Sequence, residues 1–440
     1  MTPRIEIVSG SNIIGGNCVK IWLNNDEYVL LDHGLRFDLF RKYYGRFLQP
    51  LDANELRSLG ALPELKHILN ASAVYISHLH LDHLGSLDYL DIVNYENNKK
   101  LKVFLPQKEY FTSLLDTWRY SWKSVLLPHS RTSLDRVSDI MDSNNEVSQV
   151  VPVRVFHSAY PSYSMIITTD YGETLYTGDF RLESIIKSLQ NSISTSIVDE
   201  LLELLYGSSD YDPLVEITNH IDKLDALIIE GTNFGRAIAP LSGEHFVSII
   251  EQIIGRHPTV VSLHHLDIES IIAILIISQF NDKQTIVYSK RIAKFLDHVL
   301  GEKILRELNV GYTDKRALPT LSLDYIPLDL AIGELLREES VIITDFESID
   351  IARALMRKGS LGKTIMALLI SSEPTNEEYA IEQRRQLEWF RKAKIQPYRV
   401  RVSGHYYPHQ FMKIMKLLKP GHILPIHTNY PSYILRAAEQ

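Results

Sequence analysis

The sequence predicts an α/β protein in which a parallel sheet flanked by helices forms one distinct part of the chain. Three observations support this prediction. Through residues 227–370, short branched-apolar runs alternate with helical patterns, as in chains that form parallel sheets. The first third contains runs of strand length that lead into a strand–loop–helix unit. A histidine-rich hexapeptide directly follows one of these runs.

The composition limits the class of protein. The chain has 440 residues, and 46 Lys and Arg against 54 Asp and Glu give a net charge of −8. A hydrophobic fraction of 45% is ordinary for a soluble globular protein and excludes a disordered or collagen-like chain. The negative charge argues against general coating of nucleic acid, although a local basic groove remains compatible with it. Because the apolar run Ile271–Ile277 is too short to cross a bilayer, we expect a buried helix there and no membrane partner.

Cys18 is the single cysteine of the chain. It can form neither an internal disulfide nor a thiolate zinc cluster, so a transition metal would need His, Asp or Glu ligands. The lack of disulfides agrees with a reducing, cytoplasmic location. The first ten residues, MTPRIEIVSG, do not resemble a signal peptide.

The first part of the chain is predicted to be rich in strands. The turn residues Asn24-Asn25-Asp26 separate two apolar runs and indicate a hairpin. Residues 84–90 read as the start of a helix, directly after the histidine-rich segment. Strands are expected at Ile5–Val8, Val19–Leu23, Tyr28–Leu31, Ala73–Ser77, Val151–Phe156, Met165–Thr168 and Thr174–Thr177.

The second part begins after a mainly helical stretch at residues 182–222. From there on, strands are expected at Leu227–Ile229, Thr259–Val261, Thr285–Val287, Val341–Ile343 and Ile365–Ile370. The tail then returns to a strand–loop–helix–strand pattern. We therefore predict a first domain over 1–232, an inserted domain over 233–397 and a return to the first domain over 398–440.

The hexapeptide 78–83 reads His-Leu-His-Leu-Asp-His, a pattern that chance produces in a chain of this composition on the order of once in a thousand. In an extended segment, His78 and His80 point to the same side. Asp82 and His83 follow where the chain turns into a helix, so they can face a second centre. The motif can therefore supply two ligands to one metal and two to its neighbour.

Further ligand candidates come at the ends of apolar strands. His157, Asp179 and His427 each follow such a run, and the Asp179 carboxylate could bridge two cations. Each residue alone could be structural, but with the hexapeptide they complete a set of five His and two Asp. Nitrogen and oxygen ligands suit two divalent ions, with Zn²⁺ favoured and Mn²⁺ as the alternative. Two ions about 3.5–4 Å apart create hydroxide at neutral pH and stabilise charge on a phosphoryl or acyl oxygen, which is the chemistry of hydrolysis.

These motifs resemble those of the metallo-β-lactamase superfamily. The similar segments are SHLHLDHLG (77–85), HSAY (157–160), YTGDFRLE (176–183) and PIHT (425–428). The long interval between Asp179 and His427 resembles the stretch in which nucleases of the ribonuclease J type carry an inserted β-CASP domain. Ile229–Asn233 and Val402–His405 resemble two motifs of that family. The resemblance implies a metallo-β-lactamase αββα sandwich with an inserted β-CASP domain.

The resemblance also implies roles for individual residues. His78, His80 and His157 would bind one metal, Asp82, His83 and His427 the other, and Asp179 would bridge them. Asp82 and Glu230 are among the catalytic candidates. Glu230 would orient a neighbouring ligand. His405 would touch the scissile phosphate or protonate the leaving oxygen. Asp32 matches a structural acid near the ligand loop.

The chain departs from the family at three places. His33 follows Asp32 where a small or apolar residue is usual, and Tyr406 and Tyr407 follow His405 where Ala is usual. Those tyrosines could stack on a base or cap the wall of the site. Thirteen residues follow His427, so we expect a short, archaeal-type form without the C-terminal domain of bacterial members. A homodimer is one candidate assembly.

Five residues are candidates for binding a substrate phosphate. Ser371 and Ser372 follow an apolar strand, Ser289 and Lys290 follow another, and Ser403 lies beside His405. Hydroxyls and a lysine at strand ends can hold a phosphate, and the alternatives are an ordinary turn and solvated charge.

We therefore predict a two-metal ribonuclease that acts on single-stranded RNA, as a 5′→3′ exonuclease in which a hydroxide bridging two metals attacks the phosphorus. An endonuclease like the one that processes messenger 3′ ends, and a DNA-end-processing nuclease, are alternatives with the same fold. A small-molecule hydrolase and an inactive nucleic-acid-binding scaffold come from other classes. A small-molecule hydrolase would lack the long insertion, and an inactive scaffold would not need the complete ligand set.

Overall fold

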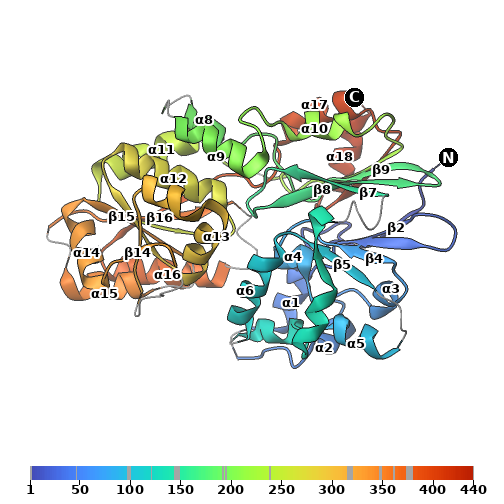
Figure 1. Ribbon diagram of the computed structural model, residues 1–440, viewed down its shortest axis with the longest axis horizontal. Helices are drawn as coiled ribbons and strands as arrows, with labels where there is room; N and C mark the ends of the chain where they lie inside the picture. The colour runs from blue at the N-terminus through green and yellow to red at the C-terminus, as the bar shows by residue number, and fades with distance from the viewer. Residues whose placement is uncertain are drawn as a thin grey trace. The chain divides into compact units, whose positions relative to one another are not determined.

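The computed structural model describes residues 2–45, 47–96, 101–119, 121–142, 149–190, 193, 196–236, 239–314, 321–345, 349–359, 362–372 and 380–439. They belong to two compact units (Figure 1). The first unit consists of Met1–Leu182, Asp212–Ala239 and His405–Gln440, and the second of Glu183–Tyr211 and Pro240–Gly404. The domain boundaries expected from the sequence stay a prediction, because these units describe compactness alone.

The first unit contains two mixed sheets. In the first sheet the order is β1 (Ile5–Ser9), β2 (Cys18–Trp22), β3 (Tyr28–Leu31), β4 (Ala73–Tyr75), β5 (Lys102–Leu105) and β6 (Val137–Asp139). In the second sheet it is β18 (His422–Ile426), β10 (Ala226–Glu230), β9 (Gly172–Tyr176), β8 (Ser162–Thr169) and β7 (Val150–Val155). The expected hairpin is present, because β2 pairs with β3 antiparallel. The first sheet continues parallel from β3 to β6, and β9, β10 and β18 are parallel in the second.

The two sheets of this unit face each other across a common apolar core. Val19 and Ile21 of β2 pack in one buried cluster with Met165 and Ile167 of β8, because alternate residues of each strand point inward. The helices of the unit are α1 (Phe37–Tyr43), α2 (Ala53–Ser58), α3 (Leu65–Leu69), α4 (Leu81–Leu84), α5 (Tyr89–Glu96), α6 (Lys108–Trp118), α10 (Pro213–Asn219), α17 (Phe411–Leu418) and α18 (Pro431–Ala438). Short 3₁₀ turns span Trp122–Leu126, Arg131–Arg136, Ile140–Asp142 and Pro408–Gln410.

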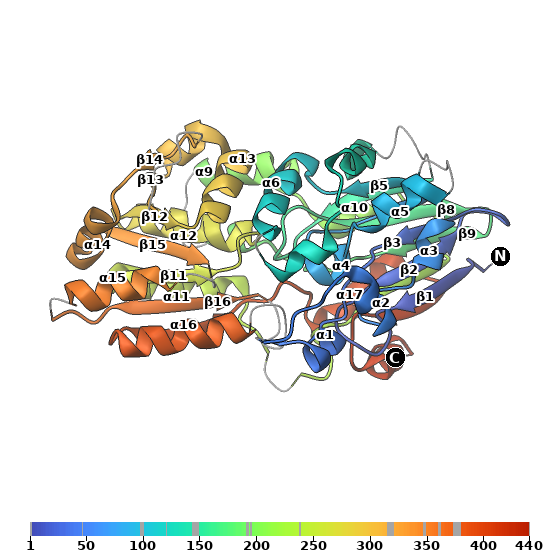
Figure 2. The same cartoon turned by 90° about the horizontal axis from the view of Figure 1, so that it is seen from below.

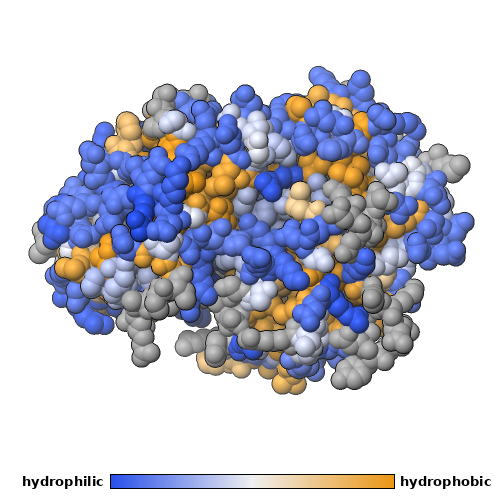
Figure 3. Space-filling view, viewed as in Figure 1, coloured by the Kyte–Doolittle hydropathy of each residue, from blue (hydrophilic) through white to orange (hydrophobic). Residues whose placement is uncertain are grey.

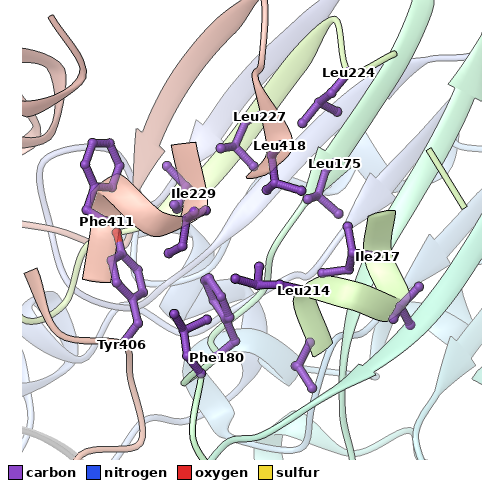
Figure 4. Packing of buried hydrophobic residues seen from close by; sticks show 14 of the residues in the cluster. Leu175, Phe180, Leu214, Ile217, Leu224, Leu227, Ile229, Tyr406, Phe411 and Leu418 are labelled. Atoms are coloured by element: carbon purple, nitrogen blue, oxygen red, sulfur yellow. The ribbon is translucent and has the colours of Figure 1, made fainter. Parts of the chain in front are cut away.

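A second apolar core joins the outer face of the second sheet to its helices. Figure 4 shows Leu175, Leu227 and Ile229 of the sheet near Leu214 of α10 and Phe411 of α17. The remaining helices lie on the side of the first sheet (Figure 1). The predicted αββα sandwich is therefore confirmed. Residues 84–90, expected to be the start of one helix, are instead mainly the connection between two helices, because α4 ends at Leu84 and α5 begins at Tyr89.

The second unit is built on a seven-stranded parallel sheet, as the alternating pattern predicts. Its order is β14 (Asp324–Tyr325), β13 (Val310–Tyr312), β12 (Gln284–Tyr288), β15 (Ser340–Asp345), β11 (Thr259–Leu263), β16 (Met366–Ser371) and β17 (Gln396–Arg401). The helices are α8 (Ile185–Gln190), α9 (Ser196–Tyr206), α11 (Gly243–Arg256), α12 (Ile268–Phe280), α13 (Lys290–Glu307), α14 (Leu328–Arg337), α15 (Asp350–Lys358) and α16 (Ala380–Lys392). One face of the sheet is covered by α14, α15 and α16 (Figure 2).

The apolar run Ile271–Ile277 lies in α12 and is buried, as expected. Glu269, on the same helix, is fully buried and forms hydrogen bonds with the segment that contains α8 and α9. It accepts hydrogen bonds from Ser184 Oγ, the Ile185 N–H and Tyr206 Oη at 2.7–2.9 Å. These bonds explain why the segment Glu183–Tyr211, which follows the first stretch of the first unit in sequence, belongs to the second unit.

The surface is ordinary for a globular chain. The face shown in Figure 3 is mainly hydrophilic, with scattered apolar areas. Among the described residues, no helix combines the length and the apolar character needed to cross a membrane.

Candidate metal centre

The ends of four strands of the first unit carry the predicted ligands. In the second sheet, β9, β10 and β18 are parallel, so their carboxyl ends meet at one edge. Asp179 follows β9 and His427 follows β18. His157 follows β7 in the same sheet, and the hexapeptide follows β4 of the first sheet.

The structure brings all seven predicted ligands into one buried cluster. None of these side chains belongs to a residue more than 9% exposed. Four overlapping groups have ligand atoms within 4.8 Å of one another: His78, His80 and His157; His78, His83 and Asp179; Asp82, His83 and His427; and Asp179, His405 and His427. The first and third groups contain the residues expected to bind each of two metals, and Asp179 takes part in both of the others.

Asp32 holds the histidines on one side of this cluster. Its carboxylate accepts hydrogen bonds from the Ser77 backbone N–H at 2.7 Å and from Ser77 Oγ at 2.9 Å. His83 Nδ1 lies 2.7 Å from Asp32 Oδ2, which turns His83 Nε2 toward Asp179 Oδ2 at 3.1 Å. Asp32 adopts a left-handed φ of 59°, a backbone conformation that is uncommon outside glycine and is found at functional sites.

The polar atoms of the cluster fit a bound cation. His78 Nε2 is buried, and the described residues offer it no hydrogen-bond partner, which is rare for a buried polar atom. His83 Nε2 faces a carboxylate oxygen while its other nitrogen also faces a carboxylate. A divalent ion would satisfy both features, because imidazole nitrogens and carboxylate oxygens are common ligands of Zn²⁺ and Mn²⁺.

The electrostatics of the cluster also suit a cation. Burial lowers the pKa of His78 well below its usual value, and the neighbouring histidines add to this effect. For His83 burial acts in the same direction, but the Asp179 and Asp32 carboxylates outweigh it and raise the pKa well above its usual value. Burial tends to raise the pKa of Asp179, but His427 and His83 hold it well below its usual range. The carboxylates thus favour positive charge at this point of the cluster, which a bound cation would supply.

His427 is held from three sides. Its backbone N–H donates to the Gly10 carbonyl at 2.9 Å, and Thr232 Oγ1 lies 2.9 Å from its Nδ1. Its Nε2 lies 3.2 Å from Asp82 Oδ2. The φ of His427 is 49°, so this predicted ligand also adopts a strained backbone at the site.

Glu230 contacts His405 and the loop after β10. Its Oε1 lies 3.2 Å from His405 Nδ1, and its Oε2 accepts the Thr232 N–H at 2.8 Å. The resemblance implies that Glu230 orients a neighbouring ligand, and in the structure it connects to His427 through Thr232. His405 is fully buried, and its ring centroid lies 5.1 Å from that of His157. Both residues therefore lie against the ligand cluster.

The five predicted phosphate-binding residues all belong to the second unit, and they form two groups. Ser289 Oγ donates to Asp345 at 2.7 Å and caps α13, whose first residue is Lys290. Ser372 donates to Asp267, and the carbonyl of Ser372 accepts the N–H of Gly404, next to Ser403. Because β15 and β11 lie between β12 and β16, the two groups are about 14 Å apart, so they cannot share one phosphate. The role of each group stays a prediction.

Sequence reasoning missed several residues that support the centre. The hydroxyls of Ser77 and Thr232 contact His78 and His427. The Tyr176 hydroxyl donates to Asp32, and the Asn17 side chain donates to that hydroxyl. Gly15 has a φ of 83°, and a Cβ at this position would lie 2.8 Å from Asp82 Oδ2. Hydroxyls at strand ends are too common in sequences to single out these supporting residues.

Comparisons with known proteins agree with this architecture. No family model matches the sequence. Ribonuclease J of Pyrococcus abyssi (strain GE5 / Orsay) is 21% identical over 456 aligned positions, which cover 97% of this chain and 90% of the relative. The expected resemblance to ribonuclease J is confirmed.

A solved structure shows likeness of fold over most of the chain. A protein of unknown function from Enterococcus faecalis V583 superposes with a TM-score of 0.69 at 18% identity, over 98% of this chain and 95% of the other. The metallo-β-lactamase fold protein YhfI of Bacillus subtilis covers 55% of this chain and 74% of its own, with a TM-score of 0.27 and 11% identity. The similarity to ribonuclease J, like that to the first of these structures, therefore extends over both compact units.

Proposed function

We propose that this protein is a metal-dependent ribonuclease that hydrolyses phosphodiester bonds of single-stranded RNA as a 5′→3′ exonuclease. The observation that carries the proposal is the buried cluster of five His and two Asp, in a chain similar to ribonuclease J over 97% of its length. We further propose that the second unit is of the β-CASP type and that the protein acts in the cytoplasm. A homodimer is the assembly we would test first.

In this proposal, His78, His80 and His157 hold one divalent ion, Asp82, His83 and His427 hold the other, and Asp179 is shared. Zn²⁺ is the favoured ion and Mn²⁺ the alternative. When bound, two such ions lower the pKa of water to near neutrality and stabilise negative charge on phosphoryl oxygens. The protein contributes nitrogen and oxygen ligands whose orientation is set by Asp32, Ser77 and Thr232.

His405 is the group we assign to proton transfer. The Glu230 carboxylate lies at 3.2 Å from its Nδ1, so Nδ1 carries a proton and Nε2 is directed away from Glu230. A histidine oriented by a carboxylate can hold and release a proton near neutral pH. We propose that the His405 side chain protonates the 3′ oxygen that leaves when the phosphodiester bond breaks.

The experiment is a cleavage assay on single-stranded RNA labelled at the 5′ end. Substrates with 5′-monophosphate, 5′-triphosphate and 5′-hydroxyl ends are compared with a DNA strand of the same sequence, in added Zn²⁺ or Mn²⁺. We expect release of labelled mononucleotide from RNA. Labelled fragments longer than one nucleotide, without labelled mononucleotide, would show internal cleavage and would support an endonuclease in place of an exonuclease. Faster cleavage of DNA would favour a DNA-end-processing enzyme, and no cleavage of either strand would overturn the proposal.

A further inference from the structure

The fully buried Tyr176 donates a hydrogen bond from its hydroxyl to Asp32 Oδ2. Tyr176 is the last residue of β9 in the second sheet, whereas Asp32 follows β3 in the first. The same oxygen also accepts Ser77 Oγ at 2.9 Å and lies 2.7 Å from His83 Nδ1. Three donors from separate parts of the chain thus converge on one carboxylate oxygen.

Asp32 determines which nitrogen of His83 keeps its proton when a metal takes the place of the other. An ionised carboxylate only accepts hydrogen bonds, so His83 Nδ1 must be the donor in the 2.7 Å contact. His83 Nε2 is then the nitrogen directed at the predicted metal. The orientation of Asp32 therefore decides whether His83 presents the correct atom.

The same reasoning extends to His78. The hydroxyl of Ser77 has one proton, which it donates to Asp32. His78 Nδ1 lies 3.0 Å from Ser77 Oγ, so this nitrogen must donate. His78 Nε2 is left with a lone pair, and it is the buried atom that lacks a partner among the described side chains and backbone. One carboxylate thus sets the tautomers of two predicted ligands, each assigned to a different ion.

Asn17 continues this network toward a third predicted ligand. Its side-chain amide donates to the Tyr176 hydroxyl at 3.4 Å, and its backbone N–H donates to the Asp82 carbonyl at 2.9 Å. Both Asn17 and Tyr176 are fully buried. Asn17 therefore orients the Tyr176 hydroxyl toward Asp32 and connects it to the segment that carries Asp82.

We propose that Tyr176 and Asn17 are positioning residues that hold Asp32, and through it His83 and His78, in the geometry that binds metal. The inference rests on the proposed function for its metal site. Packing alone would explain the ring of Tyr176 in the core between the sheets. The donated hydrogen bond gives the hydroxyl a separate role, because partners that orient metal-binding histidines commonly change metal affinity when they are removed.

The test compares Tyr176→Phe with Tyr89→Phe. Tyr89 is also fully buried in the first unit, but its hydroxyl has no hydrogen-bond partner among the described residues. Both variants keep the ring and remove one hydroxyl. Affinities for Zn²⁺ and Co²⁺ are measured on the full-length protein by chelator competition, together with the visible spectrum of the Co²⁺ form and the thermal unfolding curve.

We expect Tyr176→Phe to weaken binding of at least one ion by about tenfold and to shift the Co²⁺ absorption bands. Tyr89→Phe should bind metal as the wild type does. Equal metal affinities and equal spectra in the two variants would overturn the inference. If Tyr176→Phe does not fold, Asn17→Ala carries the test, and unchanged metal affinity in that variant would overturn it.

The outcomes separate this inference from the proposed function. Wild-type protein that binds two ions without cleaving RNA would contradict the ribonuclease proposal, while the comparison of metal affinities would still decide the role of Tyr176. Wild-type protein that binds no divalent ion would overturn both. RNA cleavage by the wild type with unchanged metal binding in Tyr176→Phe would overturn only the inference.

Discussion

Polar residues gather at strand ends in both compact units, but their hydrogen bonding differs. In the second unit these groups pair with each other: Asp345 accepts Ser289 Oγ and pairs with Arg291 at 3.0 Å, and Asp267 accepts Ser372. In the first unit His78 Nε2 is buried with no hydrogen-bond partner in the described part of the chain, and His83 lies between two carboxylates.

The difference indicates which strand ends need an added cation. A buried imidazole nitrogen without a partner costs free energy comparable to a lost hydrogen bond, and a divalent ion at the centre would satisfy His78 Nε2. The contacts of Ser289, Asp345 and Ser372 explain their burial within the second unit. The cluster around Asp179 is explained when divalent ions complete it.

Removal of a predicted ligand should have the largest effect. We expect His80→Ala to lower RNA cleavage by at least about a thousandfold, because the first ion loses one of its ligands. Metal content measured on the purified variant should fall, while the far-UV circular dichroism stays that of the wild type. His220→Ala, at an exposed histidine outside the cluster, is the matched control. Full activity in His80→Ala would remove this residue from the site.

Loss of His405 should leave the metal content intact. We expect His405→Ala to slow cleavage by about 10²- to 10⁴-fold, since a proton donor is lost while the seven other ligand candidates remain. The rate is measured at saturating RNA over a range of pH, and one limb of the pH profile should disappear. If the variant instead loses metal, His405 is a ligand, as its grouping with Asp179 and His427 would allow.

Metal binding should release protons at neutral pH. The Asp179 and Asp32 carboxylates outweigh burial and raise the pKa of His83 well above its usual value, so a metal must displace a proton from this residue. Affinity should therefore increase as the pH rises toward that raised pKa, by about tenfold per pH unit for each proton displaced. Titration calorimetry in buffers of different ionisation enthalpy counts the protons. The same heat in every buffer at pH 7 would contradict this expectation.

The smallest effect is expected in the second unit. Ser289 caps α13 and donates to Asp345, so Ser289→Ala should lower the free energy of unfolding by about 1 kcal/mol without changing the metal content. Denaturant unfolding measures the loss. Unchanged stability, together with a selective loss of activity on 5′-monophosphorylated RNA, would instead support the predicted phosphate role of Ser289.

Much of the fold and the ligand set could be predicted from local patterns. Apolar runs predicted many strands of both units, although β5, β6, β13 and β14 were not among them. The run Ile271–Ile277 predicted a buried helix that the structure contains. The exact helix boundaries around residues 84–90 could not be predicted, because Gly85 interrupts the chain between α4 and α5 with a φ of 57°. The separation of Ser289 from Ser372 also depended on strand order, which apolar patterns do not specify.

The sequence by itself determined which atoms are available at the centre: a histidine-rich hexapeptide, and His157, Asp179 and His427 after apolar strands. It also excluded cysteine thiolates as a complete ligand set. Only the tertiary structure decided that Tyr176 donates to Asp32 and that Glu230 lies beside His405. These contacts join residues 144 and 175 positions apart in the chain. No local pattern encodes such pairs, because they form only when the two sheets of the first unit pack and the chain re-enters that unit at His405.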